Sequence, residues 1–188
     1  MGEIKSTLEI ALEKAKAVEI SNEERERFKR EEVLAKARDI FSRFKSRPSR
    51  TTRLAQEIKR SGGDVPLLKA CLTEIFLEAL DVAHSSERIW QGLQELGLKD
   101  PVPFKESLAR IAEDEGKARR EETEKVENTL RESLAESGIS GTAVDPNIEE
   151  NAHWRDFLTD LDERVSEDLK MLRQRIFRAI EAGNSSSR

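Results

Sequence analysis

Several residue types that carry chemistry or build folds are scarce in this sequence of 188 residues. It has one cysteine, two histidines, two tryptophans and no tyrosine. The single cysteine, Cys71, excludes an intrachain disulfide and favours a reducing, cytoplasmic setting. Because Cys71 falls on an apolar row, we expect a buried and unreactive thiol. No apolar run reaches the roughly 18 residues of a membrane helix, and the N-terminus lacks a secretory pattern, so we expect no membrane partner.

Charge is abundant where these residue types are scarce. Charged residues make up 38% of the chain and apolar residues 36%, with only nine glycines and five prolines. This composition favours elongated helices with charged faces, and no stretch alternates apolar and polar residues as a strand does. The expected fold is all-α, an elongated antiparallel bundle of long, partly coiled-coil-like helices without a sheet.

An amphipathic pattern predicts a central helix over residues 65–96. Its apolar residues recur at alternating steps of four and three, and its first half carries a second apolar row. Asp64 is the expected N-cap and Gly97 the expected left-handed C-cap. At residues 84–86 the helix either continues, kinks, or ends and restarts. The expected seam is Leu68, Leu72, Ile75, Ala79, Val82, Ser86, Ile89, Leu93 and Leu96.

Cap and turn signals divide the chain into one helical domain, 1–182, and a disordered tail, 183–188. We expect a first helix at about 3–20, a second that ends before Pro48, and a short one that stops at Gly62 and Gly63. The expected parts are basic N-terminal helices at 1–63, central long helices at 64–136, a loop at 137–147 and a C-terminal helix at 148–182. Ten of the thirteen residues at 113–125 are charged, which predicts a solvated helix there.

The basic residues are concentrated early in the chain. Residues 1–63 carry 16 basic against 11 acidic residues, whereas residues 64–188 carry 17 against 27. The densest part, which we call the basic segment, is residues 36–60, and it can meet the acidic residues at 113–124 or an acidic protein partner. The alternative is a nucleic acid, although no nucleic-acid-binding signature accompanies the charge. The candidate partner-binding residues are Arg43, Lys45, Arg47, Arg50, Arg53, Lys59 and Arg60.

Two carboxylate–histidine pairs raise a metal-binding hypothesis. Asp81 with His84 and Glu150 with His153 have the i, i+3 spacing that helical di-metal sites use. However, the helical seam places Asp81 and His84 on the outer face, and His153 lies off the stripe that Trp154 begins. We therefore disfavour a metal site and expect no cofactor.

Other catalytic signatures are missing. The chain contains no glycine-rich phosphate loop, no serine nucleophile motif and no cysteine–histidine pair, so a non-enzymatic protein is expected. Trp90 and Trp154 lie beside or on apolar stripes, which favours core packing over interface anchoring.

Two short stretches resemble known proteins. MGEIKS at residues 1–6 with LEIALE at 8–13 resembles the start of small uncharacterised bacterial helical proteins, which suggests a bacterial source and implies no activity. Gly138-Ile139 followed by residues 144–147 (VDPN) is similar to part of the signature of bacterial GrpE nucleotide-exchange factors, which are dimers of long paired helices. The chain departs from that family at 150–152, and Asp-Pro-Asn is also a good helix start.

These observations favour a cytoplasmic, non-enzymatic interaction or scaffold protein that self-associates as a dimer. Apolar helix stripes would supply the packing energy, and the basic segment would select the partner. The alternative is a nucleic-acid-associated factor, and a metal-binding bundle is third.

Overall fold

The computed structural model describes residues 22–46, 54–83, 86–139, 141 and 145–185. The described residues form six α-helices and one short 3-10 helix, without a strand among them. The elements are α2 (Asn22–Ser46), α3 (Leu54–Ser61), α4 (Val65–Glu78), α5 (Glu87–Glu95), α6 (Val102–Glu136), η1 (Ile148–Glu150) and α7 (Ala152–Ser185). The predicted all-α class is confirmed, whereas the helix predicted at about 3–20 lies outside the described residues.

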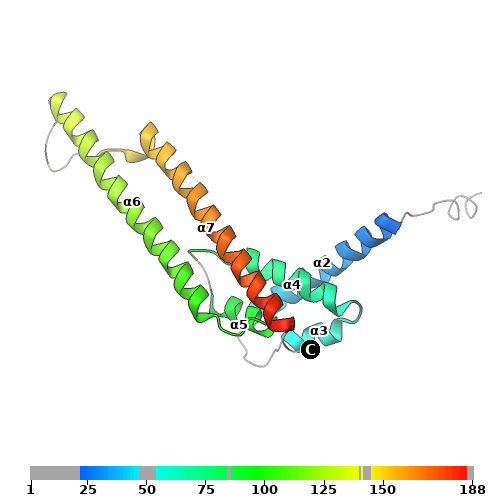
Figure 1. Ribbon diagram of the computed structural model, residues 1–188. Helices are drawn as coiled ribbons and strands as arrows, with labels where there is room; N and C mark the ends of the chain where they lie inside the picture. Colours follow the sequence, from blue (N-terminus) through cyan, green and yellow to red (C-terminus); the bar gives the residue numbers. More distant parts are fainter. Residues whose placement is uncertain (1–21, 47–53, 84–85, 140, 142–144, 186–188) are drawn as a thin grey trace, which may run out of the picture.

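The helices make two structural parts. We call α2 to α5 the lobe and the antiparallel pair α6 and α7 the hairpin. Figure 1 shows the hairpin projecting from the lobe in one direction, while the N-terminal half of α2 extends from the other side. Packing between α4 and α7 joins the two parts. The outer half of the hairpin therefore stands away from the lobe.

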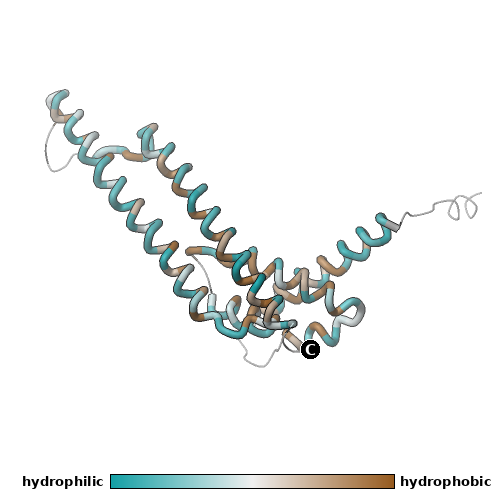
Figure 2. Tube along the Cα trace, in the orientation of Figure 1, coloured by the Kyte–Doolittle hydropathy of each residue, from teal (hydrophilic) through white to brown (hydrophobic). Residues whose placement is uncertain are grey.

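The main hydrophobic core lies where the lobe meets the C-terminal half of α7. Phe41 and Phe44 of α2 pack edge-on against Phe76 of α4, with ring centroids 4.9 and 5.5 Å apart. Apolar residues gather at this junction, whereas hydrophilic ones dominate the outer hairpin (Figure 2). Its most deeply buried large side chains are Phe44, Phe76, Ile40, Leu54, Leu72, Leu80, Leu93, Leu96 and Ile176.

The predicted central helix is two helices. Asp64 caps α4 as predicted, accepting the Leu67 N–H at 3.1 Å, and Gly97 ends α5 with φ at +124°. Between them α4 ends at Glu78 and α5 starts at Glu87, so the predicted seam is wrong from residue 79 to Ser86. The apolar period continues through residues 79–83 and Ser86, which are not helical, and this continuation made the two helices look like one.

Side chains from other helices cap the ends of α4 and α2. Arg173 of α7 donates from Nη2 to the carbonyl oxygens of Leu80 at 2.8 Å and Glu78 at 3.3 Å. Arg88 of α5 donates from Nε to the Phe44 carbonyl at the end of α2, 2.8 Å away. Helix C-termini carry partial negative charge, so both guanidinium groups satisfy carbonyls and complement the helix dipole. The Arg173 bonds thus satisfy carbonyl groups that the end of α4 leaves without helical partners.

The segment at 113–125 is continuous helix within α6, as expected. Its solvation is uneven: the Glu122 side chain is only 12% exposed and the Glu115 side chain 24%. Both lie on the α6 face that carries the buried Leu108 and Val126. The expectation of a wholly solvated segment is therefore wrong for this stripe and correct for the outer face.

The C-terminal helix differs from its prediction at both ends. Residues 148–150 form the 3-10 turn η1, and α7 begins at Ala152. The predicted disordered tail is wrong for residues 183–185, which continue α7. Gly183 is buried, and the Asn184 amide donates to the Leu96 carbonyl at 3.3 Å. Packing against the end of α5 therefore keeps this turn helical.

No helix among the described residues combines the length and the apolar character needed to cross a membrane.

Candidate interaction surface

The predicted basic segment is partly neutralised within the lobe. Arg43 lies 2.7 Å from the Asp39 carboxylate and 3.3 Å from that of Glu57, and Arg60 lies 4.0 Å from Glu57. Lys45 and Lys59 are exposed. The predicted residues Arg47, Arg50 and Arg53 lie outside the described residues. The described part of the segment therefore offers less free positive charge than its composition suggests.

The acidic residues at 113–124 meet bases of their own helix. Arg119 lies 3.0 Å from Glu115, Lys125 lies 3.0 Å from Glu122, and Lys117 lies 3.9 Å from Glu121. Within the part of the chain that is described, no ion pair joins this segment to the basic segment of the lobe. The two halves pair elsewhere: Lys29 and Arg30 of α2 lie 2.9 and 3.9 Å from the carboxylates of Asp64 and Glu74.

The metal-site candidates do not come together. Asp81 is exposed in the turn after α4, Glu150 is exposed in η1, and His84 lies outside the described residues. His153 instead donates to the Glu122 carboxylate of α6 at 2.7 Å. The hydrogen bonds from Lys125 and then His153 lower the pKa of Glu122. The described residues contain no group of three His, Cys, Asp or Glu side chains arranged to hold a metal ion.

The remaining sequence candidates are buried residues. Cys71 is 2% exposed, and burial, followed by the nearby Glu74 charge, raises the pKa of its thiol. A raised pKa keeps the thiol protonated and poorly nucleophilic. Trp90 and Trp154 are also buried, as predicted, and Trp154 stacks on Phe157 with ring centroids 5.6 Å apart.

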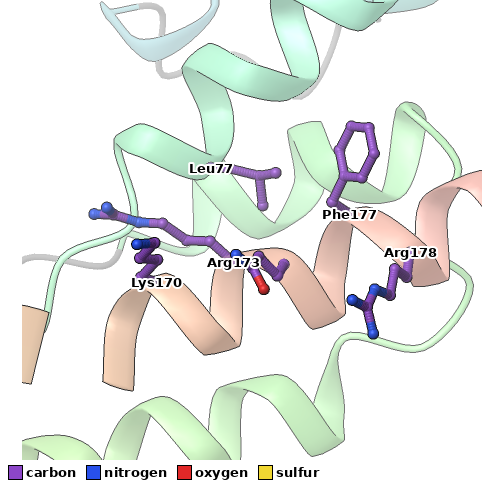
Figure 3. A pocket seen from close by; sticks show the side chains of 6 residues that line it. Leu77, Lys170, Arg173, Phe177 and Arg178 are labelled. Carbon is purple, nitrogen blue, oxygen red and sulfur yellow. The ribbon is translucent and has the colours of Figure 1, made fainter. Parts of the chain in front are cut away.

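An apolar hollow of about 300 Å³ lies between α4 and α7. Leu77 of α4 and Phe177 of α7 supply its apolar surface, and Figure 3 shows both side chains lying between the two helices. Leu77 is largely buried, whereas Phe177 is half-buried. The hollow lies at the solvent-exposed edge of the hydrophobic core, where the lobe meets the hairpin.

Three cationic side chains line this hollow, and no acidic side chain does. Lys170 and Arg173 lie at one end and Arg178 at the other (Figure 3). Arg173 is held by its bonds to the end of α4, as described above. Lys170 and Arg178 are exposed, and neither pairs with an acid among the described residues. We call the hollow and these three cations the basic groove.

The charges of α7 are segregated along its length. From Ala152 to Asp168 the helix has six acidic and two basic residues, and from Leu169 to Ser185 it has four basic and one acidic. Within its described span, α7 forms no ion pair between its own side chains. The acidic half lies on the outer hairpin and the basic half lies against the lobe (Figure 1).

A second hollow, of about 400 Å³, lies on the other side of α7 beside the start of α6. Phe104 and Ala179 line it, together with Lys99, Arg175 and Asp100. The Asp100 carboxylate balances part of the positive charge there, and the Arg175 guanidinium lies 5.9 Å from the Phe104 ring centroid. This hollow therefore has a weaker preference for an anionic partner than the basic groove has.

The basic groove was not among the sequence candidates. Leu77 lies within the predicted central helix but in neither of its predicted apolar rows, and its position beside Phe177 depends on the packing of α4 against α7. The signal that was available is the segregation of charge within 148–182, which is visible in the sequence as an acidic run followed by a basic one.

Comparisons with protein-family models, with curated proteins and with solved structures found no match for this chain.

Proposed function

We propose that this protein is a non-enzymatic helical interaction protein that binds an acidic segment of a protein through the basic groove. The observation that carries the proposal is the combination of an apolar hollow with exposed cations at both ends and no lining carboxylate. Apolar contact supplies affinity, while the cations favour an acidic partner and repel a basic one.

The chemistry of the groove favours a helical peptide over a small molecule or a nucleic acid. The hollow is shallow and lies along α7, so a second helix can lie beside it and insert one or two side chains. Lys170 and Arg178 are eight residues apart, about 12 Å along a helix. Carboxylates spaced by two turns on a partner helix match that separation.

A nucleic acid remains the alternative for the basic segment of the lobe. Arg43 and Arg60 share the Glu57 carboxylate, which lowers the charge available for phosphates. Retention on DNA or RNA that falls steeply with salt, and that Lys45→Ala with Lys59→Ala weakens, would favour this alternative over the groove.

A photo-crosslinking residue in place of Gln174, which lines the groove, tests the proposal. In cells that make the protein, we expect adducts with an acidic segment, identified by mass spectrometry. Lys170→Glu with Arg178→Glu should abolish the adduct. Lys69→Glu with Arg110→Glu makes the same change in net charge on other exposed surfaces and should leave the adduct in place. No adduct, or one indifferent to the groove variant, would count against the proposal.

A further inference from the structure

The N-terminal half of α7 presents acidic side chains on the same helix face as the basic groove. At 100° per residue, the acids Asp156, Asp160 and Glu163 fall with the groove residues inside an arc of about 140°. All three acids are exposed. None of them pairs with a cation among the described residues. This face of α7 is therefore mainly acidic in its first half, with Arg155 at its edge, and mainly basic in its second, with Glu181 beyond the groove.

These opposite charges cannot pair within one chain. Asp156 and Arg178 are separated by 22 residues, about 33 Å along the helix, and Glu163 and Lys170 by about 10 Å. Both separations exceed the reach of an ion pair. Apart from α6 and the adjoining turn η1, no described helix covers the acidic half of α7 (Figure 1). The acidic half is thus available to a second molecule.

We infer that the acidic segment bound by the basic groove is the acidic half of α7 in a second copy of this chain, the two α7 helices running antiparallel. A two-fold axis beside Ser166 and Glu167 places Glu163 of one copy opposite Lys170 of the other. The same register places Asp160 opposite Arg173. Each interaction occurs twice, as an isologous interface requires.

The register also brings the ends of the charged face together. Asp156 of one copy lies opposite Phe177 of the other, one residue from Arg178 at the far end of the groove. Thr159 faces Gln174, beside the hollow that Leu77 and Phe177 line. At the axis, Ser166 of one copy lies opposite Glu167 of the other. In this register no acidic side chain of the face lies directly opposite another acidic side chain.

This inference rests on the proposed function, because it names the segment that the groove binds. The test measures molar mass by light scattering on a size-exclusion column. The full chain should be a dimer at low salt, and about 1 M salt should shift it toward monomer, because the paired charges are exposed and screened.

Charge reversal tests the register. Asp156→Lys with Glu163→Lys reverses two of the three acids named above, and Lys170→Glu with Arg178→Glu reverses two of the three cations of the groove. Each variant alone should dimerise at least about tenfold more weakly than the natural chain. An equimolar mixture of the two should recover the dimer, and so should one chain that carries all four changes. A variant that had lost its fold would not be rescued by its partner.

The control is the Lys69→Glu with Arg110→Glu chain, which should keep the dimer. If either reversal unfolds the chain, the single changes Glu163→Lys and Lys170→Glu make the same mixing test. A monomer at every concentration in low salt overturns the inference, as does a dimer that both reversals leave intact or a mixture that stays monomeric.

The two proposals fail separately. A monomeric chain whose Gln174 crosslinker captures an acidic segment of another protein retains the proposed function and loses the self-pairing. A chain whose crosslinker attaches to residues 156–163 of a second copy supports both. A chain that forms no adduct and no dimer supports neither.

Discussion

The helices α6 and α7 have nearly the same length, 35 and 34 residues, and both are rich in charge. In α6 the signs are interleaved, and four ion pairs join residues three or four apart. In α7 the signs are segregated into an acidic and a basic half, and the described helix has no such pair. Interleaved charges stabilise the helix that carries them, whereas segregated charges add no such pairs within α7, which is the basis of the self-pairing that we propose.

The two helices also differ in what their apolar residues contact. Only Leu108 and Val126 of α6 are buried, so α6 is anchored by a narrow stripe on α7. The C-terminal half of α7 packs into the main core through Leu169, Leu172, Ile176 and Ile180. The lobe therefore fixes the position of α7, the helix whose charges do not pair with one another. A rigid position of this kind suits a binding face.

The largest expected difference comes from truncating one isoleucine in each helix. Ile176→Ala removes a fully buried side chain of α7 and should lower the free energy of unfolding by about 2–5 kcal/mol. Ile111→Ala removes a half-buried side chain of α6 and should cost less than half as much. Urea denaturation of the two variants measures both values. Equal losses would mean that α6 is anchored as firmly as α7.

A glycine in each helix gives the next largest contrast. A Cβ added at Gly183 of α7 lies 2.5 Å from the Gly97 carbonyl oxygen, so Gly183→Ala forces the backbone apart and should cost about 1–3 kcal/mol. At Gly116 of α6 the nearest atom is the Arg120 Nη1, 3.4 Å away. Gly116→Ala should therefore stabilise the chain by about 0.5–1 kcal/mol through helix propensity. Thermal unfolding should show a lower melting temperature for Gly183→Ala and a higher one for Gly116→Ala. Melting temperatures that shift in the same direction would contradict the contrast.

Local sequence signals predicted the helix ends that local bonds determine. The Asp64 carboxylate, the glycine pair after α3 and the left-handed Gly97 all lie where their sequence patterns place them. The end of α4 was not predicted, because it depends on Arg173, which lies 93 residues beyond Leu80. Helical periodicity cannot reveal a cap that comes from another helix.

The same limit applies to the candidate site. The sequence analysis selected the basic segment with the highest charge density, but the structure pairs Arg43 and Arg60 with Glu57. The unpaired cations Lys170 and Arg178 lie in a part of the chain whose overall charge is negative. Their significance depends on Leu77, which only the packing of α4 on α7 brings beside them. Net charge over a long segment conceals such a local arrangement.

The contact between the two helices at the outer hairpin should depend on pH. Lys125 and His153 lower the pKa of Glu122, so the ionised carboxylate stabilises the folded chain above the ordinary glutamate pKa of about 4.3. This stabilisation is lost as the pH falls through the lowered pKa, when Glu122 becomes protonated. Glu122→Gln should therefore reduce the melting temperature at neutral pH, by less than Gly183→Ala does, and have no effect in strong acid. An equal reduction at both pH values would point to lost packing.

The smallest expected change in stability comes from neutralising one glutamate in each helix, and it should have opposite signs in α6 and α7. Glu115→Gln in α6 removes the ion pair with Arg119, 3.0 Å away, and should destabilise the chain by a few tenths of a kcal/mol, about 0.3. Glu163→Gln in α7 relieves repulsion from Asp160 and Glu167, one turn away on each side, and should stabilise the monomer by about as much.

Urea titrations in low salt measure this contrast. The protein is diluted until the midpoint of urea unfolding no longer depends on its concentration, so that association does not contribute. Raising the salt should shrink both effects together, since both are electrostatic and exposed. If Glu163→Gln destabilised the dilute monomer, its carboxylate would have a cationic partner within the chain. The acidic half of α7 would then be satisfied internally, as the charges of α6 are, and the contrast between the two helices would no longer indicate a second molecule.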